Sequence, residues 1–438
     1  SIHVDRVENR FLLAGGDDAT VSVYDLSKRG SEQYLNRPKN TISEYSTKWN
    51  YQEGSIHKPI ARSLREPPQV FSSEATNIEI PAGHSAPISK VQWYTVDSGA
   101  FLSSAKDGAL LIWDTDSLSP VALCRPFGTK PINNFHLSPL RDYSTVVASL
   151  HDSSIKLVDI RTGASSHTLL GHSQQGVSSV QWAPCSDVIL ASGGLDGTVR
   201  LWDIRKAGSR SCVVIMNQDV TQPPSVAKAC KADYSHLPKP SSGLDIIDTT
   251  VATDTSLLNA RRLHRKKKIV TTTSTANAAP NNYRPTESTS IVSHGGAVSA
   301  VSFTADGQHL VSTGQDGNLH IWDLRSSNAF HLPLRFLGPG QQPVVSRQKK
   351  QVPMLLIPEK SSLGQCWVAN GTSLYSFSLD QGGTPRQVLD GHLHNITAID
   401  TIEASLQLLT AGKDGMILTW GKHRQQERKR KVDDRDSW

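Results

Sequence analysis

Histidine, serine and aspartate recur in this sequence at spacings that could bring a base, a nucleophile and an orienting carboxylate together, as in a hydrolase. The clearest set is His172, Ser192 and Asp196, and Trp202 follows the aspartate by six residues. The set occurs four times in register: His84, Ser103, Asp107 and Trp113; His172, Ser192, Asp196 and Trp202; His294, Ser312, Asp316 and Trp322; His392, Thr410, Asp414 and Trp420. Catalysis would need one specialised copy with an oxyanion site, whereas a structural bond can repeat. The multiplicity therefore predicts a structural role, with no catalytic residue and no enzymatic activity.

Other residue types that carry chemistry are not arranged for it. The five cysteines lie far apart, without a Cys-x-x-Cys pair or interleaved histidines. This spacing argues against a disulfide framework and a structural zinc site, and it favours a reducing compartment. Glycine-rich stretches such as residues 14–18 lack the Lys-Ser/Thr pair and the following helix of a phosphate-binding loop. We therefore expect no metal and no cofactor.

Short repeated units must position these sets. The six-residue offset returns in three degenerate copies, Asp18 to Tyr24, Asp152 to Val158 and Asn370 to Ser376, which makes seven copies. Without the long stretches 31–82, 207–290 and 421–438, each copy spans about 41 residues, as in β-propeller repeats of the WD40 type. Segments such as residues 198–202 are short, β-branched and bounded by Asp-Gly turns, which predicts strands joined by tight turns.

The sequence thus predicts an all-β fold, a single seven-bladed propeller over residues 1–420. The expected blades are at about 1–30, 83–120, 130–165, 171–206, 291–328, 350–381 and 391–420. We expect 31–82 and 207–290 to be long insertions, the second of low complexity, basic and disordered, and 421–438 to be a basic tail. Because the chain begins at Ser1 within an expected strand, we expect further residues upstream, and an exposed sheet edge at the seventh blade without them.

These motifs resemble the WD40 family over most of the chain. The resemblance implies that each of the four sets is a hydrogen-bonded chain, from the histidine before the first strand, through the hydroxyl on the second strand and the turn aspartate, to the tryptophan of the third. A buried carboxylate is costly unless it is hydrogen-bonded, so the aspartate needs these donors. Large apolar side chains are expected to fill the spaces between blades: Trp93, Trp113, Trp182, Trp202, Trp322 and Trp420.

Three copies end their third strand on an arginine. Arg161 follows Asp159, Arg205 follows Asp203 and Arg325 follows Asp323, each by two residues. In a propeller of this type these arginines would lie on the face opposite the His and Asp loops. One interpretation is a set of local salt bridges on a solvated surface. The other is docking, because the Trp-Asp-x-Arg pattern resembles the signature of substrate receptors that bind the DNA-damage-binding adaptor of cullin-4 ubiquitin ligases; the implied adaptor-binding residues are Arg161, Arg205, Arg325, Asp203 and Asp323.

The positive charge is concentrated outside the repeats. The 438 residues include 46 Lys and Arg and 40 Asp and Glu, a net charge of +6. Without 261–268 and 421–438 the remaining charge is about −3. Basic runs such as 261–268 and 428–431 are typical of solvated linkers, nuclear import signals or nucleic-acid contacts. We favour import into the nucleus, and because no aromatic residues interleave with the lysines, direct nucleic-acid binding is not expected.

An integral membrane protein is excluded by the hydropathy pattern, because no apolar run approaches the ~20 residues of a membrane span.

Segments of the chain resemble more narrowly the Cockayne syndrome group A family of WD40 proteins. The matching segments are 10–26, 91–118, 170–207 and 303–310. This resemblance implies a non-catalytic substrate receptor of a cullin-4 ubiquitin ligase in transcription-coupled nucleotide excision repair, with the DNA-damage-binding adaptor, stalled RNA polymerase II and its repair-coupling ATPase as partners. A substrate-facing rim would hold the residues just before the turn aspartates, Lys106, Leu195, Gln315 and Lys413. A generic nuclear scaffold for a chromatin or ribosome-maturation assembly remains the alternative.

Overall fold

Antiparallel strands make up the computed structural model, in seven sheets of four strands each among the residues that it describes. These are residues 1–27, 49–51, 59–64, 80–96, 98–125, 127–139, 144–173, 176–206, 211–218, 292–325, 330–332, 334–338, 343–344, 352–359 and 362–422. They belong to one unit, drawn from 1–232 and 291–438, while the second unit, 233–290, lies outside the described residues. The basic runs 261–268 and 428–431 also lie outside them. Within the described ranges, no helix has the length and apolar character needed to cross a membrane.

Each sheet is one blade, and we number the blades in chain order. The first contains β1 (Ile2–Val4), β2 (Phe11–Gly15), β3 (Val21–Asp25) and β5 (Ala61–Arg62). The second contains β6 (Ile88–Trp93), β7 (Ala100–Ala105), β8 (Leu110–Asp114) and β9 (Ser119–Cys124). The third contains β10 (Ile132–Leu137), β11 (Thr145–Leu150), β12 (Ile155–Asp159) and β13 (Ala164–Leu169). The fourth contains β14 (Val177–Trp182), β15 (Ile189–Gly194), β16 (Val199–Asp203) and β17 (Cys212–Ile215).

In every blade the strands are named from the innermost to the outermost, and this order also holds for the remaining three. The fifth contains β18 (Val298–Phe303), β19 (His309–Gly314), β20 (Leu319–Asp323) and β21 (Phe330–Leu332). The sixth contains β22 (Met354–Glu359), β23 (Ser362–Asn370), β24 (Ser373–Ser378) and β25 (Gln387–Asp390). The seventh contains β26 (Ile396–Ile402), β27 (Gln407–Gly412), β28 (Ile417–Lys422) and β4 (Trp49–Tyr51).

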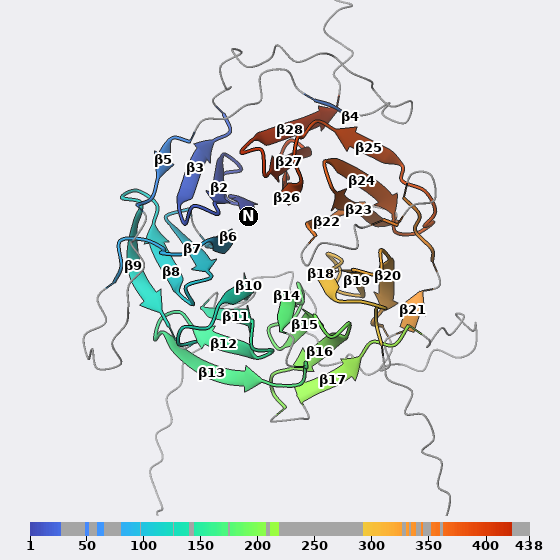
Figure 1. Ribbon diagram of the computed structural model, residues 1–438, viewed down its shortest axis with the longest axis horizontal. Coiled ribbons are helices and arrows are strands. Elements are labelled where there is room, and N and C mark those ends of the chain that lie inside the picture. The colour runs from blue at the N-terminus through green and yellow to red at the C-terminus, as the bar shows by residue number, and fades with distance from the viewer. Residues whose placement is uncertain are drawn as a thin grey trace, which may run out of the picture. The chain divides into compact units, whose positions relative to one another are not determined.

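The blades form a closed ring (Figure 1). Each innermost strand contacts the innermost strand of the next blade, in the order β1, β6, β10, β14, β18, β22, β26 and back to β1. The predicted all-β, seven-bladed propeller is therefore confirmed. Its blades also carry the Asp-Gly turns that the repeats predicted: Gly108, Gly197, Gly317 and Gly415 each follow a turn aspartate with φ between 72° and 84°, a conformation that favours glycine.

Residues 31–82 were predicted to be an insertion outside the blades, but two short segments of this range form strands of the propeller. Its strand β5 pairs with β3 and completes the first blade, and its strand β4 pairs with β28 and completes the seventh, with Tyr51 opposite Trp420. Figure 1 shows β4 beside β28, at the outer edge of the last blade. The expectation of an exposed sheet edge at the seventh blade is therefore wrong. A strand from the connection between the first two blades covers that edge.

The outermost strands also extend most blades beyond their predicted limits. The second blade ends at Cys124 rather than 120, the third at Leu169 rather than 165, and the fourth at Ile215 rather than 206. The fifth and sixth end at Leu332 and Asp390, beyond the predicted limits of 328 and 381. The physical reason is exposure, because an outermost strand has little apolar pattern to reveal it. In β13, five of the six residues are exposed.

Apolar side chains are buried between neighbouring blades. Seven hydrophobic clusters occur among the described residues, and each draws its members from two adjacent blades. The six tryptophans predicted to lie between blades are at most 3% exposed. Trp367 of the sixth blade is also fully buried, opposite Ser376 on the neighbouring strand. Burial of these indole side chains contributes much of the free energy that favours closure of the propeller.

Polar side chains also connect the innermost strands. At five interfaces in the described part of the ring, a side chain of one blade accepts a hydrogen bond from a backbone N–H of the next. The pairs are Asp400 with Val4, His3 with Trp93, Gln92 with Leu137, His136 with Trp182 and Gln181 with Phe303, at 2.6–3.4 Å. These acceptors satisfy backbone donors that face the adjacent blade instead of a strand partner.

Candidate functional site

The four repeated sets of histidine, hydroxyl, aspartate and tryptophan form hydrogen-bonded chains of one geometry. The histidine Nδ1 lies 3.0–3.2 Å from the aspartate carboxylate, and Nε2 lies 2.7–2.8 Å from the hydroxyl oxygen. The tryptophan Nε1–H donates to the same hydroxyl at 2.7–2.9 Å. The chains are His84, Asp107, Ser103 and Trp113; His172, Asp196, Ser192 and Trp202; His294, Asp316, Ser312 and Trp322; and His392, Asp414, Thr410 and Trp420.

The hydroxyls of these chains are enclosed. Ser103, Ser192, Ser312 and Thr410 have no exposed surface. A nucleophile must reach a substrate, and these enclosed hydroxyls instead join neighbouring strands through their hydrogen bonds. In the fourth blade, burial raises the pKa of Asp196, but hydrogen bonds from His172, the Ser173 N–H and Thr198 outweigh that effect and keep this pKa well below its ordinary value. The carboxylate therefore stays charged as the acceptor that fixes the turn.

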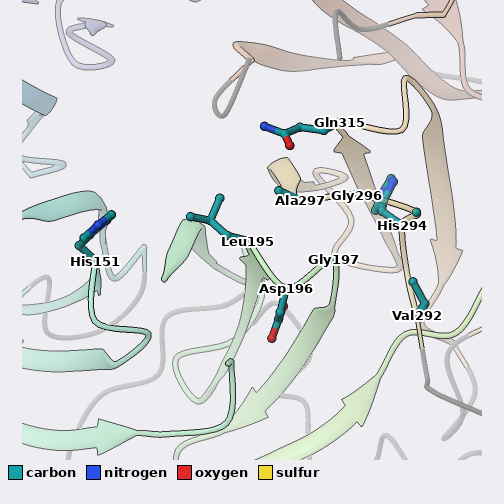
Figure 2. Close-up of a pocket in the computed structure, with 10 residues that line it drawn as sticks. His151, Leu195, Asp196, Gly197, Val292, His294, Gly296, Ala297 and Gln315 are labelled. Carbon is teal, nitrogen blue, oxygen red and sulfur yellow. The ribbon is translucent and has the colours of Figure 1, made fainter. Parts of the chain in front are cut away.

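The face that carries these turn aspartates, which we call the turn face, is hollowed beside the fourth and fifth blades. A groove of about 1020 Å³ is lined there by His151, Leu195, Asp196, Gly197, Val292, His294, Gly295, Gly296, Ala297 and Gln315. Figure 2 shows His151, Leu195 and Gln315 around this groove on turns of three neighbouring blades. Of the four predicted rim residues, the structure thus brings Leu195 and Gln315 into one groove.

One glycine sets the wall of this groove. Gly197 has a φ of 77°, and a Cβ atom there would lie 2.8 Å from the backbone oxygen of His294 and 3.0 Å from that of Gly296. The fourth and fifth blades also bond at this point, because the His294 N–H donates to the Gly197 carbonyl oxygen at 3.0 Å. Any side chain at this position would push the two blades apart.

The two predicted rim lysines lie outside the groove. Lys106 is exposed, and its Nζ donates to Asn133 Oδ1 at 2.8 Å. Lys413 is also exposed, and its backbone N–H donates to the Asn395 carbonyl oxygen at 2.9 Å. Backbone bonds of the same kind hold Leu195 to Gly176 and Gln315 to Ala297. All four predicted rim residues therefore occupy equivalent places on the turn face, though only two share the groove.

The sequence pattern missed one rim residue. His151 precedes the degenerate turn aspartate Asp152 in the third blade and occupies the place that Leu195 has in the fourth. Its backbone N–H donates to the Pro131 carbonyl oxygen at 3.1 Å, the same bond that the other rim residues make. The six-residue offset from Asp152 to Val158 was the signal that could have identified it.

The predicted adaptor-binding arginines lie at the other end of the third strands. The β16 strand starts beside the Asp196 turn and ends at Asp203, just before Arg205. Arg205 Nε and Nη2 lie 3.0 and 2.8 Å from the two carboxylate oxygens of Asp203, and the Arg205 side chain is 60% exposed. Arg325 and Asp323 form the same two-point contact, a fork, in the fifth blade. In the third blade the nitrogens of Arg161 lie farther from Asp159, at 3.4 and 3.5 Å. We call these three pairs the fork face.

A group of possible metal ligands occurs where the sequence indicated none. Ligand atoms of His294, Asp316 and His320 in the fifth blade all lie within 4.8 Å of one another. Of these, only His320 was absent from the repeated sets. His320 lies on β20, four residues after Asp316, and its side chain lies close to the turn that contains this aspartate.

Known proteins share this repeat pattern. The WD domain, G-beta repeat family matches residues 163–203 and 286–323. The WD repeat-containing protein ATCSA-1 of Arabidopsis thaliana is 26% identical, over 96% of this chain and 84% of the relative. The Radiation-sensitive protein 28 of Saccharomyces cerevisiae is 25% identical, over 44% of this chain and 49% of the relative. The Ribosome biogenesis protein YTM1 of Phaeosphaeria nodorum is 26% identical, over 45% and 49%.

The coverage of these relatives differs. The chain spans about half the length of the two fungal proteins, whereas the likeness to the plant protein extends through all seven blades. The chain is therefore a seven-bladed β-propeller that contains two matches to the WD domain, G-beta repeat family and is similar, along almost its whole length, to the WD repeat-containing protein ATCSA-1.

Proposed function

We propose that the chain is a non-catalytic substrate receptor of a cullin-4 ubiquitin ligase, acting in transcription-coupled nucleotide excision repair in the nucleus. The fork face would bind the DNA-damage-binding adaptor, and the turn face would bind the substrate. The candidate substrates are stalled RNA polymerase II and its repair-coupling ATPase. Such a receptor does no bond chemistry, because holding a substrate near the ligase raises the transfer rate through effective concentration.

The observation that carries this proposal is the repeated fork. Two of its three copies, Asp203 with Arg205 and Asp323 with Arg325, are bidentate contacts with arginine side chains 60% exposed. The fork holds each guanidinium in one orientation, and a guanidinium has five N–H donors, of which the fork of Arg205 uses two. The remaining donors would be available to carbonyl or carboxylate oxygens of a partner. Two such groups held in fixed positions form a preorganised docking surface.

The turn face offers a different chemistry. Its groove combines an apolar side chain, Leu195, with the polar groups of His151 and Gln315 and the backbone of the exposed Gly295 and the half-buried Gly296. A mixed surface of this kind suits an extended segment of another protein, because backbone and side-chain contacts are both possible. Lys106 and Lys413 lie on the same face and would favour an acidic substrate surface.

Paired binding measurements test this division of roles. Arg205→Glu combined with Arg325→Glu should weaken binding of the purified adaptor by a few kcal/mol, provided the fork pair is desolvated at the contact. Lys106→Glu combined with Lys413→Glu should leave the adaptor bound and reduce substrate capture. Arg205→Lys combined with Arg325→Lys is the matched control, because it keeps the charge and removes the fork geometry. If the double glutamate variant binds the adaptor as the parent does, the forks are local salt bridges only.

Nuclear import is proposed from the sequence alone, because both basic runs lie outside the described residues. Neutralising 261–268 and 428–431 together should move a tagged protein toward the cytoplasm. Neutralising an equal number of exposed lysines and arginines on the propeller is the control. Unchanged nuclear accumulation of the first variant would contradict import through these runs.

A second candidate function is a scaffold in ribosome maturation. The likeness to Ribosome biogenesis protein YTM1, over 45% of the chain, favours it. Affinity purification from cells separates the two proposals. Recovery of the cullin-4 adaptor supports the receptor, and recovery of ribosome-assembly proteins without the adaptor supports the scaffold.

A further inference from the structure

Two histidines of the fifth blade extend its hydrogen-bonded chain beyond the common pattern. The rings of His320 on β20 and His294 have centroids 4.6 Å apart and planes tilted by 58°. The ring of His331 on β21 also lies 4.6 Å from that of His320, edge to face. His320 Nδ1 and His331 Nε2 are 2.7 Å apart, which is a hydrogen bond. Three imidazole rings and the Asp316 carboxylate therefore form one continuous cluster, which we call the histidine cluster.

The equivalent position in the other blades shows what is special about His320. Four residues after the turn aspartate, the second and seventh blades have Leu111 and Leu418, and the fourth has Arg200. The Arg200 guanidinium lies 4.0 Å from Asp196 and so places a positive charge beside that carboxylate. In the fifth blade, His320 Nε2 lies at nearly the same distance from Asp316, 3.9 Å. The fifth blade therefore has an imidazole nitrogen, which can bind a cation, where the fourth blade has a guanidinium that is itself positively charged.

Two ring nitrogens of the cluster lack a hydrogen-bond partner in the described part of the protein. They are Nε2 of His320 and Nδ1 of His331, both buried. Buried polar atoms are nearly always paired, so these two nitrogens could each accept a bound water or ion. If His320 donates its Nδ1–H to His331, its Nε2 carries a lone pair directed toward Asp316. This tautomer is the one in which metal-binding histidines are held, with the second nitrogen donating to a neighbouring acceptor.

The spacing of the three candidate ligand atoms suits a small transition-metal ion. Bonds of ~2.0–2.1 Å from zinc to nitrogen and oxygen place tetrahedral ligand atoms about 3.4 Å apart. His294 Nδ1 lies 3.2 Å from both carboxylate oxygens of Asp316, and His320 Nε2 lies 3.9 Å from one of them. All three ligand atoms lie within 4.8 Å of one another, which is wider than the ideal, so the His320 ring would move inward on binding. His294 can keep its contact with Ser312 through Nε2, which lies 2.8 Å from the hydroxyl.

We propose that the histidine cluster binds one divalent transition-metal ion of the zinc type, with His294, Asp316 and His320 as ligands, His331 as the residue that orients His320, and water in the open position. Two nitrogens and one carboxylate oxygen are the donor set that zinc accepts when a coordination position stays open. The side chains of Asp316 and His320 are 13% and 12% exposed, so the histidine cluster lies just below the surface. His331 Nε2 lies 2.7 Å from His320 Nδ1, so a neutral His331 can accept the hydrogen bond that orients His320.

The ion would bind the folded ring and not the separated strands. His294 precedes the first strand of the blade, Asp316 follows the second, and His320 lies on the third. An ion held by all three would join the beginning of the blade to its middle. Metal binding that requires the folded arrangement stabilises that arrangement. The proposal concerns this blade alone and does not rest on the receptor function.

Zinc titration of the full chain, with any affinity tag removed, tests the site. Zn²⁺ alone is added, and binding is followed by calorimetry and by the thermal midpoint. We expect one equivalent bound and a midpoint that rises with zinc concentration. His320→Leu introduces the residue that the second and seventh blades have, and it should weaken zinc binding at least tenfold and abolish the thermal shift. His167→Leu, on exposed β13, is the matched control and should bind zinc as the parent does.

Cobalt spectroscopy keeps the proposal testable if His320→Leu does not fold. Co²⁺ bound to the parent chain should give visible absorption bands of a four- or five-coordinate nitrogen and oxygen site, and equimolar Zn²⁺ should abolish them. His331→Phe should reduce cobalt affinity several-fold, because His320 then loses its orienting partner. Equal zinc binding by the parent and by a folded His320→Leu variant, or no cobalt bands in the parent, would overturn the proposal.

Discussion

Asp400 in the seventh blade accepts a hydrogen bond from the backbone N–H of Val4 in the first blade, at 2.6 Å. Arg6 donates to the other carboxylate oxygen, and the Asp400 side chain is 6% exposed. One buried carboxylate thus joins the two blades that contain the beginning and the end of the described chain. It takes the position that His3, Gln92, His136 and Gln181 take at the other such interfaces.

Removing this carboxylate should weaken the ring. Asp400→Ala would leave the Val4 N–H without its acceptor and remove the buried charge partner of Arg6, which would keep its bond to the Thr401 carbonyl oxygen, and we expect a loss of about 3 kcal/mol in the free energy of unfolding. Asp400→Asn keeps an oxygen acceptor for Val4 and should cost less. Urea unfolding measures both, with Asp116→Ala at an exposed turn position as the control. Equal midpoints for Asp400→Ala and the parent would contradict a closing role for this residue.

The stability of the ring should fall in mild acid because of His3. Burial, aided by the positive charges of Arg6 and Lys90, lowers the pKa of His3 to about 3. An unfolded histidine titrates near pH ~6.5, so between these values the unfolded chain binds more protons and stability falls as the pH falls. His3→Gln introduces the residue that the second and fourth blades have at this position. The drop in thermal midpoint from pH 7 to pH 5 should be smaller in this variant, and it should be unchanged in His167→Gln. An identical drop in His3→Gln and the parent would exclude His3 as the cause.

The hydrogen-bonded chain of the fourth blade should contribute measurably to stability. Asp196→Ala leaves His172 and the Ser173 and Thr198 N–H groups without an acceptor, at an expected cost of about 1–3 kcal/mol. Asp152→Ala removes the corresponding turn aspartate of the third blade, which has no histidine partner among the described residues, and should cost less. Thermal unfolding of the two variants gives the comparison. The role assigned to the chain is wrong if both losses are equal.

The pairing of β4 with β28 should keep the seventh blade from associating with other molecules. Asn50→Pro combined with Tyr51→Pro removes two successive N–H groups, of which an antiparallel pair uses at least one. The exposed edge of β28 should then promote self-association, seen as increased light scattering, together with a lower thermal midpoint. Asn50→Ala combined with Tyr51→Ala keeps both N–H groups and serves as the control. A monomeric proline variant with the parent midpoint would show that β4 does not protect this edge.

Fixed spacing made the blades and their turn aspartates predictable. A side chain on one strand can meet a turn and the next strand only at set separations, so the step from Asp196 to Trp202 recurs wherever the chain of bonds recurs. The same rule located the degenerate third blade through Asp152. Alternating burial then follows from the strands, because side chains of successive residues point to opposite faces.

Long-range pairing explains what the sequence did not reveal. The three residues of β4 and the two of β5 are too short for a hydrophobic pattern, and their partners are set by the tertiary fold. Trp367 illustrates a second limit, because the sixth blade has Ser376 in the usual tryptophan position and the indole on the neighbouring strand instead. The histidine cluster needs the register of β20 and β21, which places His331 opposite Trp322 and beside His320.

The pairing of β4 with β28 also fixes an order of events during synthesis. Tyr51 leaves the ribosome long before Trp420, its partner across the last blade. At roughly 5–20 residues per second, translation from one to the other takes on the order of 20–75 s. For that interval β4 has no strand to bind, and Asp400, which will accept the Val4 N–H, has not yet been made. The nascent propeller therefore remains an open arc until the final blade emerges, which makes this period the one in which a ribosome-bound chaperone would protect it most.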